Sequence, residues 1–265
     1  MLSRYLFIIM KRLLIYAFSA IVLFSCGGET NNTDYFNPNS DWARLKLQGK
    51  VKAIKEIKFL AVDNFSEIDK CEKIKHIYNK EFLFNLDGYK IEQNDYIPDG
   101  TLANRIMYLY QNNRLVEFNE YDSQGLLFGT GKYELGEDDK PTKLNYKTND
   151  GRYNWTETFK YDENGNIIEV EHYRTENAID SKEIYNFNDD GYLNSSELHK
   201  DGKLITKNTF KTDEDGSRIK MTYGADSSVY TYIYNYDSKG NWVKKIVFEN
   251  DNPSGILIRE IEYFN

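Results

Sequence analysis

Cysteine, histidine and proline are scarce in this chain of 265 residues, with two, three and four copies respectively. His76, His172 and His199 lie too far apart in the sequence for the usual spacing of metal ligands, so we expect no metal site. The sequence also lacks a Gly-x-Ser-x-Gly motif, an HExxH motif and a cysteine close to a histidine. We therefore expect no catalytic residues and no cofactor.

Basic residues are too few for general nucleic-acid binding, because 34 Lys and Arg stand against 42 Asp and Glu, a formal net charge of -8. Hydrophobic residues make up only 40%, which argues against a large conventional α/β core. Aromatic residues are nevertheless abundant, with 22 Tyr, 15 Phe and 3 Trp, which argues against disorder. The composition therefore favours a folded, aromatic-rich chain with no nucleic-acid partner.

The apolar run at residues 13–24 is shorter than the roughly 20 residues of a membrane-spanning helix. Two cations precede it and Ser25-Cys26 follows, which is the order of a secretory signal peptide. Residues 2–10 are also apolar, so an uncleaved anchor is an alternative, although the two cations interrupt it. Met10, directly before these cations, is an alternative start of the chain.

The segment Leu23-Phe24-Ser25-Cys26 resembles the lipobox of bacterial lipoproteins, with Phe24 bulkier than the residue common there. The resemblance implies cleavage before Cys26 and transfer of a diacylglycerol to its sulfur, so membrane lipid is the expected partner of this residue. Gly27 stands where an Asp would imply the inner membrane, which favours the outer membrane without choosing between its two faces. An ordinary cleaved signal peptide is the alternative.

Residues 26–41 are polar and rich in Asn and Gly, and we interpret them as a flexible tether that follows a signal peptide at residues 1–25. If Cys26 is lipidated, only Cys71 is left, which excludes an intramolecular disulfide. A lone cysteine is most often a small buried hydrophobic residue, so we expect Cys71 to be buried.

Residues 81–265 are a repeat with a period of about 25 residues. Short segments of strand composition alternate with Asp-Gly and Asn-Gly pairs, which supply the positive φ angles of tight hairpin turns. The turn residues form two interleaved series: Gly88, Asn113, Asp138, Gly165, Gly191, Gly216 and Gly240, and Gly100, Gly125, Gly151, Asn177, Gly202, Asp226 and Asn252.

Each unit is therefore predicted to be strand, turn, strand and turn, and seven units give about fourteen strands. The predicted fold is all-β, a repetitive antiparallel β-meander in a twisted or spiralling single sheet. Before it, residues 42–80 contain a strand near residues 51–59. The segment 60–80 departs from the period of about 25 residues and fits either a hairpin with a long loop or a short helix.

Aromatic residues recur in the same register of each unit, which predicts stacked rows of rings along the sheet. Tyrosine suits such rows because its hydroxyl can stay hydrated while its ring is covered. The candidate aromatic ladder consists of Tyr96, Tyr121, Tyr146, Tyr173, Tyr223 and Phe248. A second series consists of Phe84, Tyr110, Tyr133, Tyr161, Phe187, Phe210 and Tyr236.

Several turns share the core Tyr-Asp-x-x-Gly, which resembles the tyrosine-aspartate (YD) repeats of RHS proteins. Full matches lie at residues 121–125, 161–165 and 236–240, and looser ones at 84–88 and 187–191. The resemblance implies β-hairpins that spiral into a shell or strip. The chain departs from that family because it lacks the protease-like core and the toxin domain and has too few repeats for a closed cocoon.

A repeated aromatic sheet without convergent catalytic groups favours a non-enzymatic binding or interaction scaffold in the cell envelope, with an unidentified glycan or protein as the partner. The alternative is a structural or partner-binding accessory protein, or a toxin-immunity protein. A hydrolase is less favoured, and it would need paired carboxylates such as Glu169 and Glu171.

Overall fold

The computed structural model describes residues 40–64, 67–74, 77–175, 178–214 and 216–265. These residues form seventeen antiparallel strands and one short helix, which confirms the all-β prediction. The elements are α2 (Asp41–Arg44), β1 (Val51–Asn64), β2 (Glu67–Lys73), β3 (Asn79–Phe84), β4 (Lys90–Tyr96), β5 (Leu102–Gln111), β6 (Arg114–Asp122), β7 (Leu127–Leu135), β8 (Pro141–Thr148), β9 (Asn154–Tyr161), β10 (Ile167–Thr175), β11 (Ala178–Phe187), β12 (Leu193–Lys200), β13 (Lys203–Thr212), β14 (Arg218–Thr222), β15 (Val229–Tyr236), β16 (Trp242–Glu249) and β17 (Asn252–Tyr263).

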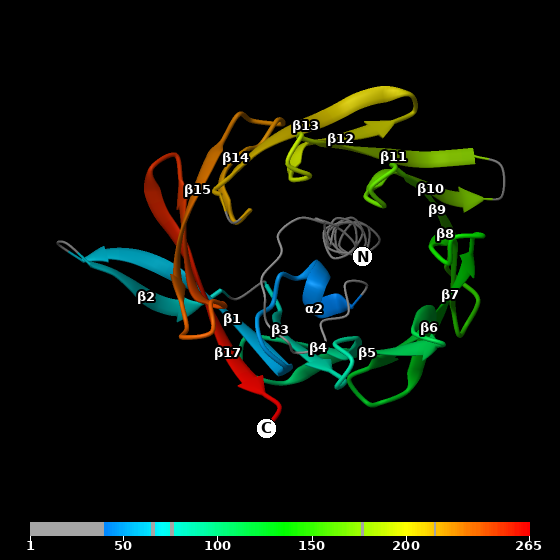
Figure 1. Cartoon of the computed structure of the whole chain (residues 1–265), viewed down its shortest axis with the longest axis horizontal. Helices are drawn as coiled ribbons and strands as arrows, with labels where there is room; N and C mark the ends of the chain where they lie inside the picture. The colour runs from blue at the N-terminus through cyan, green and yellow to red at the C-terminus, as the bar shows by residue number, and fades with distance from the viewer. Residues whose placement is uncertain (1–39, 65–66, 75–76, 176–177, 215) are drawn as a thin grey trace, which may run out of the picture.

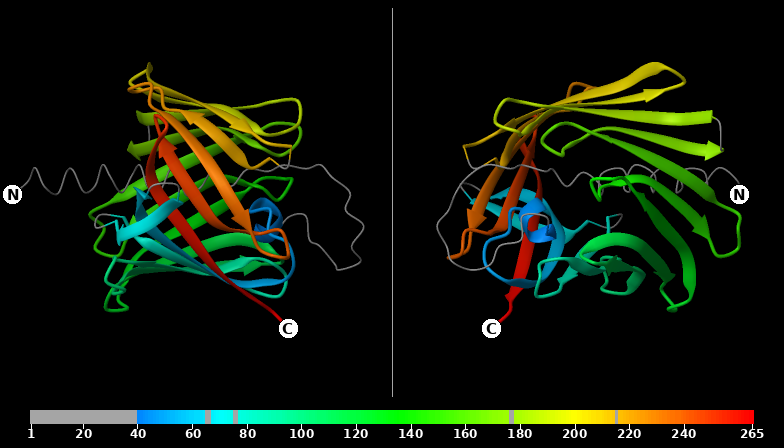
Figure 2. Two further views of the ribbon diagram at one scale, coloured as in Figure 1. Left: turned by 90° about the vertical axis from the view of Figure 1, so that its left-hand side faces the viewer. Right: turned by 45° about the vertical axis from the view of Figure 1, so that its right-hand side comes forward.

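The sheet closes on itself, because β1 pairs with β17 along one edge and with β3 along the other. All other wall strands pair with their neighbours in sequence order, so the chain forms a ring (Figure 1). β2 pairs with the outer half of β1 as a hairpin that projects from this ring, which leaves sixteen strands in a closed barrel. Figure 2 shows that the strands are inclined to the barrel axis, as closure requires.

The predicted twisted or spiralling single sheet of about fourteen strands is therefore corrected to a closed barrel. The fourteen strands of the repeat are β4–β17, and the first three strands precede them. Closure depends on pairs such as Glu56 with Arg259, which are too distant in sequence for a local pattern to reveal. A closed barrel also leaves no unpaired edge, which an open sheet of this length would expose.

The Tyr-Asp-x-x-Gly segments form hairpin turns, and each residue of the motif has a structural role. In the turn after β9, the Asp162 carboxylate accepts hydrogen bonds from the backbone N–H groups of Asn164 at 3.0 Å and Asn166 at 2.8 Å. Gly165 has a φ of +84°, which a residue with a side chain adopts only with strain. Asp237 and Gly240 repeat this arrangement after β15. The motif therefore specifies the turns that set the strand length.

Within the segment 60–80, residues 60–64 and 67–73 form the projecting hairpin of β1 and β2, residues 79–80 begin β3, and none of the described residues is helical. Cys71 lies on β2 and is exposed, so the prediction of a buried cysteine is wrong. Six of the seven residues of β2 are exposed, so this strand offers no enclosed position for a small side chain.

The short helix α2 lies inside the ring, against β3 and β4 (Figure 1). Its Trp42 is 6% exposed and packs in a cluster with Leu47, Val51, Ile54 and Phe84. The indole N–H of Trp42 donates to the Val51 carbonyl at 2.8 Å, and its backbone N–H donates to the Gly88 carbonyl at 3.1 Å. These contacts fix the entry of the chain into the barrel.

Gly88→Ala is expected to lower the free energy of unfolding by about 3 kcal/mol, because φ is +83° and a Cβ there would lie 2.7 Å from the Trp42 ring. Gly100→Ala is the matched control, with a φ of +96° and open space around its Cβ, and should cost only about 1 kcal/mol. Urea unfolding followed by circular dichroism measures both. Equal losses would show that Trp42 does not hold the Gly88 turn.

Candidate functional site

The side chains of each strand divide into an inner and an outer set, and α2 identifies the inner one. The Tyr110 hydroxyl donates to Asp41 of this internal helix at 3.0 Å, so Tyr110 faces the interior of the barrel. Tyr108 and Ile106 share that face because side chains alternate along a strand. Their neighbours Met107 and Leu109 point outward and are 45% and 47% exposed.

The inner face carries a row of stacked rings across β5, β6, β8 and β9. Phe118 lies 6.3 Å from Tyr108 and 5.9 Å from Tyr146, and Tyr146 stacks on Trp155 at 4.9 Å between ring centroids. The row passes over β7 because β7 has glycines where the rings lie. A Cβ at Gly131 would lie 2.2 Å from Phe118, and one at Gly129 would lie 2.3 Å from the Tyr146 hydroxyl.

The six residues of the candidate aromatic ladder do not share this face. Tyr146 belongs to the inner row, whereas the hydroxyls of Tyr96 and Tyr173 donate on the outer face to Glu81 at 2.9 Å and to Glu171 at 2.6 Å. The pairing of Tyr121 with Arg105 also places it outside. Tyr223 follows β14, and Phe248 pairs with Thr231 on β15.

The division of the ladder follows the side-chain alternation of each strand. At Tyr96, Tyr121, Tyr173 and Phe248 the register shifts because the neighbouring strand carries one extra residue, whereas β8 and β9 pair without a shift at Tyr146. Tyr173 itself lies outside by plain alternation, directly after His172, whose side chain faces the interior. Equal spacing in the sequence therefore does not give a single row of rings.

The second aromatic series lies mainly inside the barrel. Phe84 packs in the cluster around Trp42, and Tyr110 contacts α2. On the far side, Phe210 is part of a buried cluster with Val170, Tyr185 and Leu193, against which Phe187 packs. The second series therefore predicts the interior of the barrel better than the candidate aromatic ladder does.

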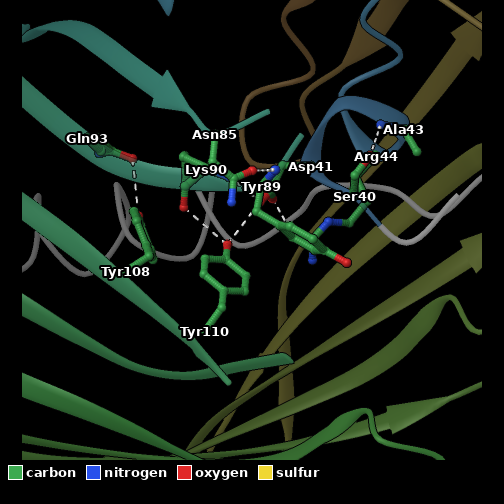
Figure 3. A network of polar contacts seen from close by, with 10 residues as sticks. All are labelled: Ser40, Asp41, Ala43, Arg44, Asn85, Tyr89, Lys90, Gln93, Tyr108 and Tyr110. Atoms are coloured by element: carbon green, nitrogen blue, oxygen red, sulfur yellow. Dashed lines mark hydrogen bonds and ion pairs between the residues drawn. The ribbon is translucent and has the colours of Figure 1, made fainter. Parts of the chain in front are cut away.

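A polar network joins α2 to the inner wall (Figure 3). The Asp41 carboxylate accepts the Lys90 backbone N–H at 2.7 Å and the Tyr110 hydroxyl, and it also pairs with Arg44. The Lys90 ammonium lies 4.5 Å from the centre of the Tyr108 ring. Burial lowers the pKa of Lys90 to about 8, an effect that the charge of Asp41 opposes.

Four cations line the next part of the inner wall, from β14 to β1. Ile54 packs against Trp42 inside the barrel, so Glu56 and Lys58 face the same interior by alternation. Glu56 accepts hydrogen bonds from Arg259 at 2.9 and 2.7 Å. We name this surface the basic wall, and its cations are Arg218, Lys245, Arg259 and Lys58.

The opposite part of the interior is acidic. His172 of β10 lies between two carboxylates, with its Nδ1 3.0 Å from Glu157 and its Nε2 3.4 Å from Glu183. Burial alone would lower the pKa of His172, but the hydrogen bonds to the two carboxylates raise it to about 10. The imidazole is therefore charged at neutral pH, and it holds together three strands of the wall.

The outer face carries ion pairs between neighbouring strands. Glu169, one of the acids considered for hydrolysis, contacts Lys160 at 2.5 Å and Lys182 at 3.2 Å. Glu171 contacts Lys182 at 2.9 Å. Hydrogen bonds from Lys160 and Tyr173 respectively lower the pKa of Glu169 and of Glu171, whereas a general acid needs a raised pKa. This pair of carboxylates therefore does not suit a glycosidase.

The described part of the chain lacks two further features. No group of three His, Cys, Asp or Glu side chains there could hold a metal ion. None of its helices has the length and apolar character that crossing a membrane requires. Cys26 and the lipobox lie outside the described residues.

No protein-family model and no curated protein matches the sequence. Among solved structures, the chain is similar to a porin-like protein from Bacteroides uniformis, with a TM-score of 0.57 and 12% identity over 81% of this chain and 99% of that one. At this identity the likeness shows the barrel fold alone.

Two further matches are TcdB2-TccC3-TEV and TcdB2-TccC3, each 13% identical to this chain. They cover 67% and 75% of this chain but only 12% and 13% of their own, with TM-scores of 0.32 and 0.33. Scores this low carry no argument about the fold.

Proposed function

We propose that this protein is a non-enzymatic binding module of the cell envelope, anchored to the outer membrane by lipid at Cys26, with its ligand site inside the barrel. The observation that carries the proposal is the contrast between the two faces of the wall. Outside, charged side chains pair with one another, whereas inside, aromatic rings lie beside Arg218 and Lys245, which form no ion pair within the described residues.

The outer face supports a barrel wall that lies in water. A barrel wall in lipid presents an apolar band outward, and a lysine at the middle of the bilayer costs about 2–4 kcal/mol there. Here Lys132, Lys160 and Lys207 lie on the outer face of three well-separated strands, with side chains 69%, 63% and 50% exposed. A lipid on Cys26 would then hold a water-exposed barrel at the membrane. Of the predicted tether at residues 26–41, the buried Ser40 and Asp41 belong to the barrel, so residues 27–39 would be the link.

Cys26→Ser is expected to move the protein from the membrane fraction to the soluble fraction and to abolish incorporation of a labelled fatty acid. The hydroxyl cannot form the thioether, and the remaining barrel surface is charged. The matched control is Cys71→Ser, which changes the exposed cysteine of β2 and should leave both the fractionation and the labelling unchanged. Full retention of the Cys26→Ser variant in the membrane would refute the lipid anchor.

A further inference from the structure

The basic wall combines positive charge with few partners inside an acidic protein. Of its four cations, only Arg259 forms an ion pair within the described residues, and its partner is Glu56. Arg218 instead lies over the Phe210 ring, 4.1 Å from its centre. The net charge of this part of the interior is thus opposite in sign to that of the whole chain.

Lys245 lies at the centre of this surface. Burial is the main cause that lowers its pKa, which falls to about 8, and the carboxylate of Glu56 opposes the shift. Arg259, Arg218 and Lys58 lower it further, which shows that these three cations lie within electrostatic reach of Lys245. Grouping like charges in a partly enclosed space is unfavourable unless an anion neutralises them.

Aromatic side chains lie between the cations. Arg259 packs over the Trp242 ring at 3.5 Å from its centre, and Lys245 lies 5.1 Å from the same ring. Tyr234 meets Trp242 edge to face at 6.0 Å. The hydroxyl of the neighbouring Tyr232 has no hydrogen-bond partner within the part of the chain that the structure describes.

The dimensions indicate an extended ligand. Arg218 and Lys58 lie on β14 and β1, which are four strand steps apart, or about 19 Å at roughly 4.8 Å per step. A single phosphate would contact one or two of the cations and would not need the rings. An acyl chain would need an apolar groove, and this wall presents ammonium, guanidinium and phenol groups.

We infer that the basic wall binds an acidic oligosaccharide whose carboxylate or sulfate groups contact Arg218, Lys245 and Lys58, while its sugar rings lie against Tyr232, Tyr234 and Trp242. Guanidinium and ammonium groups recognise such anions by charge-assisted hydrogen bonds. Sugar rings have apolar C–H faces that pack on aromatic rings and hydroxyls that a phenol can bind. The inference rests on the proposed function, because it names the ligand class of the internal site.

The test is calorimetric titration of the full-length protein, purified in non-ionic detergent, with hexagalacturonate and with a sulfated heparin hexasaccharide. We expect at least one of these anions to bind with a stoichiometry of one, and to bind more weakly when NaCl rises from 50 to 300 mM. Neutral maltohexaose, inorganic phosphate and oligothymidylate should bind at least tenfold more weakly. Binding of neither acidic hexasaccharide, or equal binding of maltohexaose or oligothymidylate, would overturn the inference.

Variants locate the site. Lys245→Met and Arg218→Met should each weaken binding about tenfold, the effect of one lost charge contact. Lys132→Met removes the same charge from the outer face, where its side chain is 69% exposed, and should leave the affinity unchanged. Circular dichroism confirms that each variant folds. A loss with Lys132→Met equal to that with Lys245→Met would assign binding to general charge and overturn the internal site.

The outcome is separable from that of the lipid anchor. If Cys26→Ser releases the protein but neither acidic hexasaccharide binds, the inference fails and the anchored module stands. If a hexasaccharide binds and the Cys26→Ser variant stays in the membrane, the ligand site stands and the proposed anchoring fails.

Discussion

Tyr146→Ala is expected to lower the free energy of unfolding by about 3–5 kcal/mol, the usual effect of removing a packed aromatic ring. Tyr146 is 7% exposed and stacks between Phe118 and Trp155. Its hydroxyl donates to Glu120 at 2.8 Å, so the substitution also leaves a buried carboxylate without this donor. The Phe118 ring cannot move to close the gap, because it already lies against Gly131 of β7.

The matched control is Tyr173→Ala, at the equivalent position of the next unit. Tyr173 lies on the outer face, where its hydroxyl donates to Glu171, so its removal should cost only about 1 kcal/mol. Urea midpoints measured by circular dichroism for the two variants provide the comparison. Equal losses, large or small, would contradict the assignment of the two tyrosines to opposite faces of the wall.

The turns and the strand count of the repeat could be predicted because they depend on local chemistry. Asp162 and Gly165 specify a turn through contacts within five residues, so a short sequence motif is sufficient to predict the turn. Apart from Asn252, which is the first residue of β17, the turn residues of the two series consequently fall between successive strands from β3 to β17.

The face on which each ring lies could not be predicted from spacing. Tyr146 and Tyr173 occupy equivalent positions of the repeat, but Tyr146 pairs with the inward-facing Trp155, whereas Tyr173 directly follows the inward-facing His172. The glycines of β7 were a usable signal, since two glycines in alternate positions of a strand indicate that something packs closely above them. Gly129 and Gly131 accept the rings of Tyr146 and Phe118 in this way.

The charged interior could not be predicted from local sequence patterns either. Arg259 and Glu56 are joined only when β17 meets β1, and Lys245 reaches the same space from β16. Read along the sequence, these residues look like the ordinary polar half of an alternating strand. Closure of the barrel instead places these residues inside, because it turns one face of every wall strand away from bulk water.

His172→Gln is expected to remove a pH-dependent part of the stability. The pKa of His172 is raised to about 10 in the folded protein, against about 6.5 in an unfolded chain. Below pH 6.5 both states carry the proton and the full stabilisation is present. As the pH rises towards 10 the unfolded state loses its proton first, so this stabilisation, up to about 4–5 kcal/mol, is progressively lost.

Two lysines titrate in the same pH range, and their effect on the pH dependence of the stability has the opposite sign. The pKa values of Lys90 and Lys245 are lowered to about 8, so these residues make the fold more stable as the pH rises above 8. The informative quantity is therefore the difference in the free energy of unfolding between the wild type and His172→Gln, because the contributions of the two lysines are the same in both proteins. That difference should be several kcal/mol at pH 6 and close to zero above pH 10.

His199→Gln supplies the control, since His199 lies on the outer face, 3.0 Å from the single carboxylate of Glu197. The free energy of unfolding of His199→Gln should stay within about 1 kcal/mol of the wild-type value at every pH, as is usual for ion pairs at a protein surface. Urea unfolding at pH 6, 8 and 10.5 gives all three curves. A difference for His172→Gln that does not change with pH would mean that the imidazole is neutral between Glu157 and Glu183. The acidic side of the interior would then lack the internal cation that now joins its three strands.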